Sequence, residues 1–202
     1  YYPEFLPHLS TCKSPQQMFG AIAKTYFAKK VGKDIKDIVV VSVMPCTAKK
    51  FEAQRPEMNS SGVTDVDYVL TTRELAKMIT QANIDFTSLP DSKMDSPLGE
   101  STGAADIFAN TGGVMEAAIR TVYELVTGKE LPLKDLHLSP IMGLDGLKRA
   151  ELKIEGTLPE WNFLEGKTLK VAVAHGLNNV REVFKMIKKG EEFHFIEAMT
   201  CP

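Results

Sequence analysis

The spacing of hydrophobic positions changes several times along the chain, and each change predicts a new element. Residues 14–30 place apolar side chains on one face at helical spacing, with Ser14 as a candidate N-cap and Pro15 in the first turn. Further helices are predicted over residues 73–81 with Thr72 as N-cap, over residues 114–127 with Gly128 as stop signal, and over residues 178–188.

Residues 37–44, DIVVVSVM, are apolar without alternation. This pattern is typical of a strand that is buried on both faces between helices. Pro45 ends the run because proline cannot donate a hydrogen bond to a neighbouring strand. Shorter strands are predicted over residues 67–71, 136–143, 153–155, 169–175 and 193–199.

The order of these elements favours an α/β fold with two lobes, each a small, mostly parallel sheet flanked by helices. Residues 84–111 carry two prolines and two glycines with little periodicity, and such a long loop is unusual inside a compact domain. We therefore expect a first lobe over residues 1–83, a connecting region over 84–111 and a second lobe over 112–202. The active site is expected in the cleft between the lobes.

Composition and charge narrow the classes of function. The 202 residues are 44% hydrophobic and 25% charged, with a net charge of −2, which is ordinary for a globular protein. No basic field indicates nucleic acid, and no polybasic patch indicates a membrane surface. The longest apolar run, Ile38–Met44, is far shorter than the ~20 residues that span a bilayer. We expect neither nucleic acid nor a membrane as a partner.

The two ends of the chain are unusual for a complete protein. The chain begins at Tyr1 without a methionine or a signal-peptide pattern, and it stops at Cys201-Pro202 directly after a strand-like run. We expect a segment of a longer, cytoplasmic protein, in which any site shared with flanking segments is incomplete here.

Cys46 is the first candidate for chemistry. It lies just past the carboxyl end of the predicted strand, where ligands bind in open α/β sheets. If a short helix follows, Lys49 and Glu52 face the same side as Cys46, and a lysine there favours a thiolate or another anion. A buried structural cysteine followed by a solvated turn explains the same spacing equally well.

Cys201 repeats this arrangement, because it also follows a predicted strand and a methionine two residues earlier. The segments Met44-Pro45-Cys46 and Met199-Thr200-Cys201 could bring two thiolates into one cleft. Soft thiolates select zinc, copper(I) or iron-sulfur clusters, and the absence of a C-x-x-C motif excludes a zinc ribbon or a thioredoxin site. Two cysteines leave a four-ligand site incomplete.

The remaining candidates are weaker. Cys12 lies in a polar stretch and is expected to be an ordinary, partly exposed thiol. The four histidines have no ligand-like spacing and are expected to be packed or surface residues: His8, His137, His175 and His194. Thr111-Gly112-Gly113 at a helix start could cradle an anion with backbone N–H groups, although a glycine pair is often only a tight turn.

Four segments together resemble one family. The nonapeptide at residues 44–52, MPCTAKKFE, resembles the M-P-C-x-x-K-x-x-E signature of the iron-iron (FeFe) hydrogenases. Residues 197–202 resemble the start of their third signature, E-x-M-x-C, and residues 108–118 match the segment between the two. The opening residues 1–4 and the SPQQ segment at 14–17 match the stretch after the first signature, T-S-C-C-P. The resemblance covers essentially the whole chain.

The resemblance implies an H-cluster, which is a 4Fe-4S cubane joined through a cysteine sulfur to a two-iron unit with carbon monoxide, cyanide and dithiolate ligands. Cys46 and Cys201 would ligate the cubane. The first cysteine ligand would lie before Tyr1 and the bridging cysteine after Pro202, so the chain by itself should be inactive. Accessory iron-sulfur clusters commonly lie outside this segment in the family.

The resemblance also implies other roles. Lys49 would donate a charge-assisted hydrogen bond to a cyanide ligand. Ser10 matches a hydroxyl of the proton path, and a capping serine ahead of the helix is the alternative interpretation. The implied partners are a ferredoxin or another redox protein, and hydrogenase maturation proteins. Five residues would wall the two-iron pocket: Gln16, Met44, Pro45, Phe108 and Met199.

Two other classes of function stay open at this point. The eukaryotic hydrogenase-like iron-sulfur proteins share the M-P-C and S-P-Q-Q segments, carry no two-iron unit, and act in cluster assembly or as interaction proteins. The segment T-G-G-V-M-E-A-A and the E-x-M-x-C match favour the enzyme. A sensory or inactive hydrogenase module is the third alternative.

Overall fold

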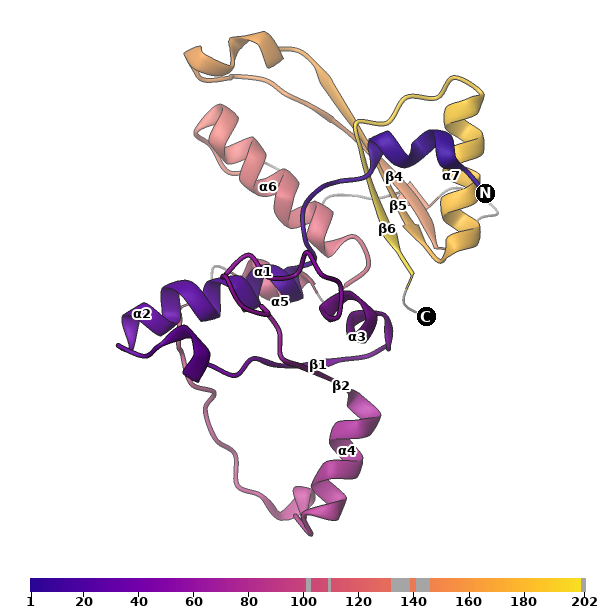
Figure 1. Cartoon of the computed structure of the whole chain (residues 1–202). Coiled ribbons are helices and arrows are strands. Elements are labelled where there is room, and N and C mark those ends of the chain that lie inside the picture. Colours follow the sequence, from indigo (N-terminus) through magenta and orange to yellow (C-terminus); the bar gives the residue numbers. More distant parts are fainter. Residues whose placement is uncertain (101–102, 109, 132–138, 141–145, 201–202) are drawn as a thin grey trace. The chain divides into compact units, whose positions relative to one another are not determined.

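The computed structural model describes residues 1–100, 103–108, 110–131, 139–140 and 146–200 (Figure 1). The chain divides into two compact units, Tyr1–Gly99 and Glu100–Pro202, and each contains a small sheet with helices. The predicted α/β class is therefore confirmed. The division falls inside the predicted connecting region, whose boundaries as a separate segment stay a prediction.

The first unit is built on a two-stranded parallel sheet. Strand β1 pairs with β2 from Val41 opposite Tyr68 to Met44 opposite Thr71, and α3 lies in the crossover that parallel pairing requires. In chain order its elements are η1 Pro3–His8, α1 Pro15–Ile22, the π-helical turn η2 Ala23–Phe27, α2 Ala28–Lys30, η3 Ile35–Asp37, β1 Val41–Met44, α3 Ala48–Ala53, β2 Tyr68–Thr71, α4 Thr72–Gln81 and η4 Phe86–Ser88.

A local polar contact moves one predicted helix start, and a second start lies where the sequence predicts it. The N-cap of α4 is Thr71 and not Thr72: the Thr71 hydroxyl accepts from the Glu74 N–H at 3.2 Å, and the Glu74 carboxylate accepts from the Thr71 N–H at 2.8 Å. This reciprocal capping box satisfies two backbone donors and explains the earlier start. Ser14 occupies the N-cap position of α1, but its side chain does not cap the helix.

Strand β1 is shorter and more exposed than its sequence predicts. On its buried side, the partly buried Met44 packs against the core cluster that contains Ala23, Val66 and Val69. On the other side, Val41 and Val43 are 52% and 41% exposed, and so the prediction of burial on both faces was wrong. The reason is that only one side of this sheet is covered among the described residues.

The second unit contains a four-stranded sheet in the order β3-β4-β5-β6. The sheet is mixed: β3–β4 and β4–β5 are antiparallel, whereas β5 and β6 are parallel and joined through α7. The prediction of a mostly parallel sheet was therefore wrong for this unit, because β4 and β5, which are consecutive in the chain, pair in opposite directions. Its elements are α5 Ala104–Phe108, α6 Gly113–Thr127, β3 Ser139–Pro140, β4 Leu147–Lys153, η5 Pro159–Leu164, β5 Thr168–His175, α7 Leu177–Lys188 and β6 Phe195–Met199.

Strand β5 is the centre of the second unit. Val171 and Val173 join Met115 and Ile119 of α6 in one apolar cluster, and Ala172 and Ala174 join a second cluster on the opposite face. The burial on both faces that the sequence predicted for residues 37–44 is therefore found at β5.

Most of the other predicted elements of this unit are confirmed. Of the strand expected over residues 153–155, only residue 153 lies in a strand, where it is the last residue of the longer strand β4. Of the strand expected over 136–143, only residues 139–140 fall within the described part of the chain. No described helix combines the length and the apolar character needed to cross a membrane.

Candidate metal centre

Cys46 lies where the sequence predicts it, directly after β1 and before the short helix α3. Its side chain is half-buried and is a thiol rather than half of a disulfide. Met44 is also half-buried and packs against the core of the first unit, whereas Pro45 is exposed. The thiol thus lies between the carboxyl end of the strand and the start of the helix.

A carboxylate links helix α3 to the start of α1. The Ser14 hydroxyl donates to Glu52 Oε2 at 2.8 Å, the Ser14 N–H donates to Oε1 at 3.3 Å, and Lys49 Nζ donates to Oε2 at 3.1 Å. Burial by itself would raise the pKa of Glu52, but the hydrogen bonds from Ser14 and Lys49 outweigh it and lower the pKa below its usual value. Glu52 therefore stays ionised and holds the Lys49 ammonium in place.

Gln16 connects three elements that are distant in the sequence. Its buried side-chain oxygen accepts from the Ser42 hydroxyl of β1 at 2.7 Å, and its Nε2 donates to the carbonyl oxygen of Lys49 at 3.3 Å. These bonds fix the position of Lys49 relative to β1. They also place Gln16 next to the segment that carries Cys46, as its predicted place in the same site requires.

A second acidic anchor precedes α1. Asp65 is fully buried and accepts from Lys13 Nζ at 2.8 Å and from the N–H groups of Ser60 and Ser61 at 3.0 and 2.9 Å. Burial acts to raise the pKa of Asp65, but the bonds from Lys13 and Ser61 lower it overall. The segment before α1 is thus bound to two carboxylates: Lys13 pairs with Asp65, and Ser14 pairs with Glu52.

The sequence analysis did not predict these hydrogen bonds, although one feature of the sequence indicated that such a bond exists. Ser42 is a hydroxyl inside an otherwise apolar strand, and a buried hydroxyl needs a hydrogen-bond partner. The partner itself has no sequence signal, because Gln16 lies 26 residues away. Ser10 is exposed, and its hydroxyl accepts from the Cys12 N–H at 3.1 Å in a local turn. Cys12 is an exposed thiol, as expected.

In the second unit, the predicted anion cradle at Thr111-Gly112-Gly113 is filled by a side chain of the protein. Glu197 Oε1 accepts from the Gly112 N–H at 3.0 Å, and Oε2 accepts from the Met115 N–H at 2.7 Å. Glu197 is the first residue of the segment that resembles E-x-M-x-C. The interpretation of the glycine pair as only a tight turn was therefore incomplete.

Two further predicted site residues of the second unit lie in the described part of the chain. Met199 is half-buried at the end of β6, opposite His175 of β5, and its carbonyl oxygen accepts from the Gly176 N–H at 2.6 Å. Phe108 ends α5 and is half-buried. Cys201 and His137 lie outside the described residues.

The donor set of the first unit fits an iron-sulfur cofactor. Cys46 offers a soft thiolate, the preferred protein ligand of iron-sulfur clusters. Lys49 adds a cation that can bind an anionic ligand, and Met44 adds an apolar thioether. In the described part of the chain, no group of three His, Cys, Asp or Glu side chains could hold a metal ion.

The fold is shared with solved FeFe-hydrogenase structures. The apo FeFe-hydrogenase HydA1 from Chlamydomonas reinhardtii, in a variant form, matches with a TM-score of 0.80 and 37% sequence identity, over 98% of this chain and 54% of that one. The whole chain, residues 1–202, also matches the family described as iron only hydrogenase large subunit, C-terminal domain. The chain belongs to this family.

Individual relatives agree with that assignment. The chain is 53% identical over 203 residues to the periplasmic Fe hydrogenase large subunit of Nitratidesulfovibrio vulgaris, and 53% identical over 201 residues to the NADP-reducing hydrogenase subunit HndD of Solidesulfovibrio fructosivorans. These matches cover 100% of this chain but only 45% and 32% of the respective relatives. The cytosolic iron-sulfur assembly component 3 of Bos taurus, of the alternative class, is 30% identical over 204 residues.

Proposed function

We propose that the protein containing this chain is an FeFe hydrogenase, which interconverts protons and electrons with dihydrogen at an H-cluster. The observation that carries the proposal is the arrangement around Cys46: a thiol at the end of β1, followed on α3 by a lysine that Glu52 holds in position. The higher identity to named hydrogenases, 53% against 30% for the assembly component, supports the same function.

The cofactor is the H-cluster, and its two-iron unit supplies the site at which dihydrogen forms or splits. Cys46 and Cys201 would hold the cubane through their thiolates. Lys49 would donate a hydrogen bond to an anionic cyanide ligand, and the ionised Glu52 limits the freedom of the lysine side chain. When the cofactor is bound, five residues would wall its two-iron unit, and the exclusion of water by these walls would keep the charge interactions strong. They are Gln16, Met44, Pro45, Phe108 and Met199.

Ser10 serves in the path of protons between the surface and the cluster. Its hydroxyl accepts one hydrogen bond from the Cys12 N–H and still has a proton to donate. A relay needs both properties in one group. Replacement of Ser10 by alanine removes both the donor and the acceptor without adding bulk. A slower turnover with an unchanged cluster content would therefore support this role.

The electron partner is a ferredoxin or another redox protein, and maturation proteins deliver the two-iron unit. We propose a cytoplasmic location, while one named relative is periplasmic. An immunoblot of separated cytoplasmic and periplasmic fractions tests the location directly. Recovery of the full-length protein in a periplasmic fraction would contradict it.

The experiment that tests the function uses the full-length protein, prepared without oxygen and supplied with the cubane and the two-iron unit. We expect hydrogen evolution from a reduced dye and infrared bands of bound carbon monoxide and cyanide. The alternative assembly protein would bind a cubane but give neither signal. A sensory module would give the infrared bands with turnover far below that of an authentic hydrogenase measured alongside.

A further inference from the structure

The N-terminal turn of α6 is held by side chains from two adjacent strands. Glu197 of β6 places both carboxylate oxygens on backbone N–H groups of this turn, 3.0 Å from Gly112 N and 2.7 Å from Met115 N. From β5, His175 Nδ1 lies 2.9 Å from the hydroxyl oxygen of Thr111. A carboxylate is favoured at this end of a helix because the first N–H groups and the helix dipole attract negative charge.

The turn has a defined shape that makes this contact possible. Gly112 has a φ of 90°, a left-handed conformation that favours glycine. A Cβ added at Gly113 would lie 1.6 Å from the carbonyl oxygen of Ile107, so that only glycine fits there. The backbone donors that meet Glu197 are therefore presented by a rigid turn.

The contact matters most for β6 because of its place in the sheet. β6 is the last strand in the order β3-β4-β5-β6, and among the described residues its one neighbouring strand is β5. Its backbone pairing with β5 runs from Phe195 to Met199. Glu197, in the middle of β6, adds an attachment to α6 that the backbone ladder does not provide. Two residues after its last paired residue, the sequence reaches Cys201.

We propose that Glu197 is a positioning residue for the iron-sulfur cluster. By joining β6 to the N-terminal turn of α6, it sets where β6 ends and so where Met199 and the Cys201 thiolate are presented. His175 supports the same turn through Thr111. This inference rests on the proposed function, in which Cys201 ligates the cubane.

The test uses the full-length protein loaded with the cubane, and compares Glu197→Ala and Glu197→Gln with the control Glu116→Gln. Glu116 lies in the same turn region of α6 but pairs with Arg120 at 2.7 Å, within its own helix. The readouts are the iron bound per protein, the electron paramagnetic resonance (EPR) spectrum of the reduced cubane, and the thermal midpoint of unfolding.

We expect Glu197→Ala to weaken cluster binding about 10- to 100-fold, the usual range for residues that orient metal ligands. The EPR spectrum of the cubane that remains should change. Glu197→Gln should lie between the parent and Glu197→Ala, because its amide oxygen replaces one acceptor but its NH₂ group faces a donor. Glu116→Gln should keep the parental iron content and spectrum.

Unchanged cluster binding and EPR spectra in both Glu197 variants would overturn the proposal, even if their thermal midpoints fall, because that result indicates a purely structural role. If Glu197→Ala does not fold, the nearly isosteric Glu197→Gln decides the question by the same spectra. A parental protein that binds no cubane would instead refute the proposed function.

Discussion

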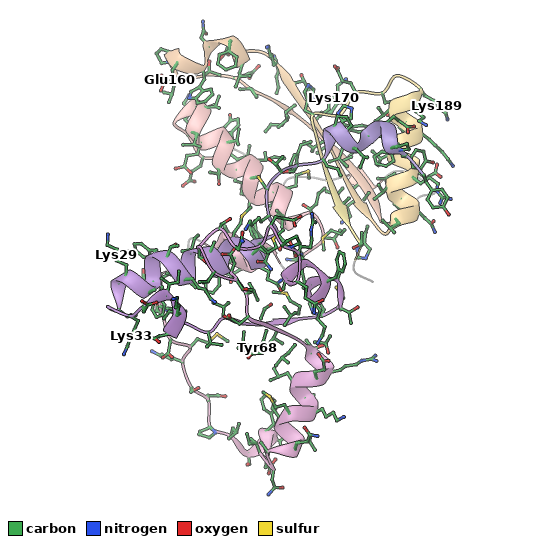
Figure 2. The ribbon with its side chains drawn as sticks, in the orientation of Figure 1. Lys29, Lys33, Tyr68, Glu160, Lys170 and Lys189 are labelled. Atoms are coloured by element: carbon green, nitrogen blue, oxygen red, sulfur yellow. The ribbon has the colours of Figure 1, made fainter. Side chains whose placement is uncertain are left out.

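Strand β1 of the first unit and strand β5 of the second unit are both rich in apolar residues but differ in burial. In β5, Val171 to Ala174 are at most 2% exposed, because helices or strands cover both faces. In β1, Val41 and Val43 are about half exposed, and Tyr68 beside them is 63% exposed (Figure 2). An apolar run thus predicts a strand, but the number of neighbouring elements decides how much of it is buried.

The two units also position their site residues by different means. In the second unit, apolar clusters support β5 and β6, and the carboxylate of Glu197 joins β6 to α6. In the first unit, with its smaller core, buried polar bonds hold the site segment: Glu52 with Ser14, and Gln16 with Ser42. Directional bonds specify position more strictly than apolar contacts, which suits a segment that presents a ligand and a cation.

The largest expected effect concerns the ligand of the first unit. Cys46→Ala in the full-length protein removes a thiolate from the cubane and should abolish cluster binding, measured as iron content and visible absorption. Cys12→Ala is the matched control, because Cys12 is exposed and has no proposed metal role. Parental iron loading in Cys46→Ala would remove this residue from the ligand set.

The second largest expected effect distinguishes the roles of two neighbouring lysines of α3. Lys49→Ala should lower hydrogen turnover about 10- to 100-fold by loosening the two-iron unit, while the cubane content stays at the parental level. Lys50→Ala is the control, because Lys50 pairs with Glu74 at 2.8 Å instead of Glu52. Equal turnover in the parent and Lys49→Ala would refute the role of this ammonium, and equal losses in both variants would point to a general effect of charge.

The loss of stability when a valine is shortened to alanine should depend on the burial of that valine and not on how apolar the surrounding sequence is. Val173→Ala removes a fully buried side chain of β5 and should lower the free energy of unfolding by about 2 kcal/mol. Val43→Ala makes the same change in β1 at a partly exposed position and should cost less than about 1 kcal/mol. Urea denaturation of both variants measures the difference. Equal losses would show that the exposed face of β1 is covered in solution.

The smallest effect is a dependence of stability on pH that arises in the first unit. The folded pKa of Asp65 lies below its usual value, so its contribution to stability is complete above about pH 3.9 and is lost as the pH falls through the lower folded pKa. Asp65→Asn should flatten the loss of stability between pH 5 and pH 2, measured by denaturation at each pH. Lys13→Met removes the same ion pair and should flatten it too; a parental slope in both variants would exclude this carboxylate as the source.

Local sequence determined the elements whose signals lie within a few residues. Helix α7 and strands β5 and β6 are found within two residues of the predicted bounds, because periodicity, glycine stops and β-branched runs act over short distances. The nonapeptide around Cys46, together with three further segments, likewise indicated the family, because such motifs can be read directly from the order of residues in the chain.

Tertiary structure decided which groups meet. Glu197 binds a helix turn 82 and 85 residues away, Glu52 binds a hydroxyl 38 residues away, and Gln16 accepts from a strand 26 residues away. Nothing in the local pattern selects such partners, since many polar side chains are available and only the packing of helices on sheets brings particular donors and acceptors within 3 Å of each other. The sequence by itself thus determined the elements and the family, and the folded chain determined the anchors of the site.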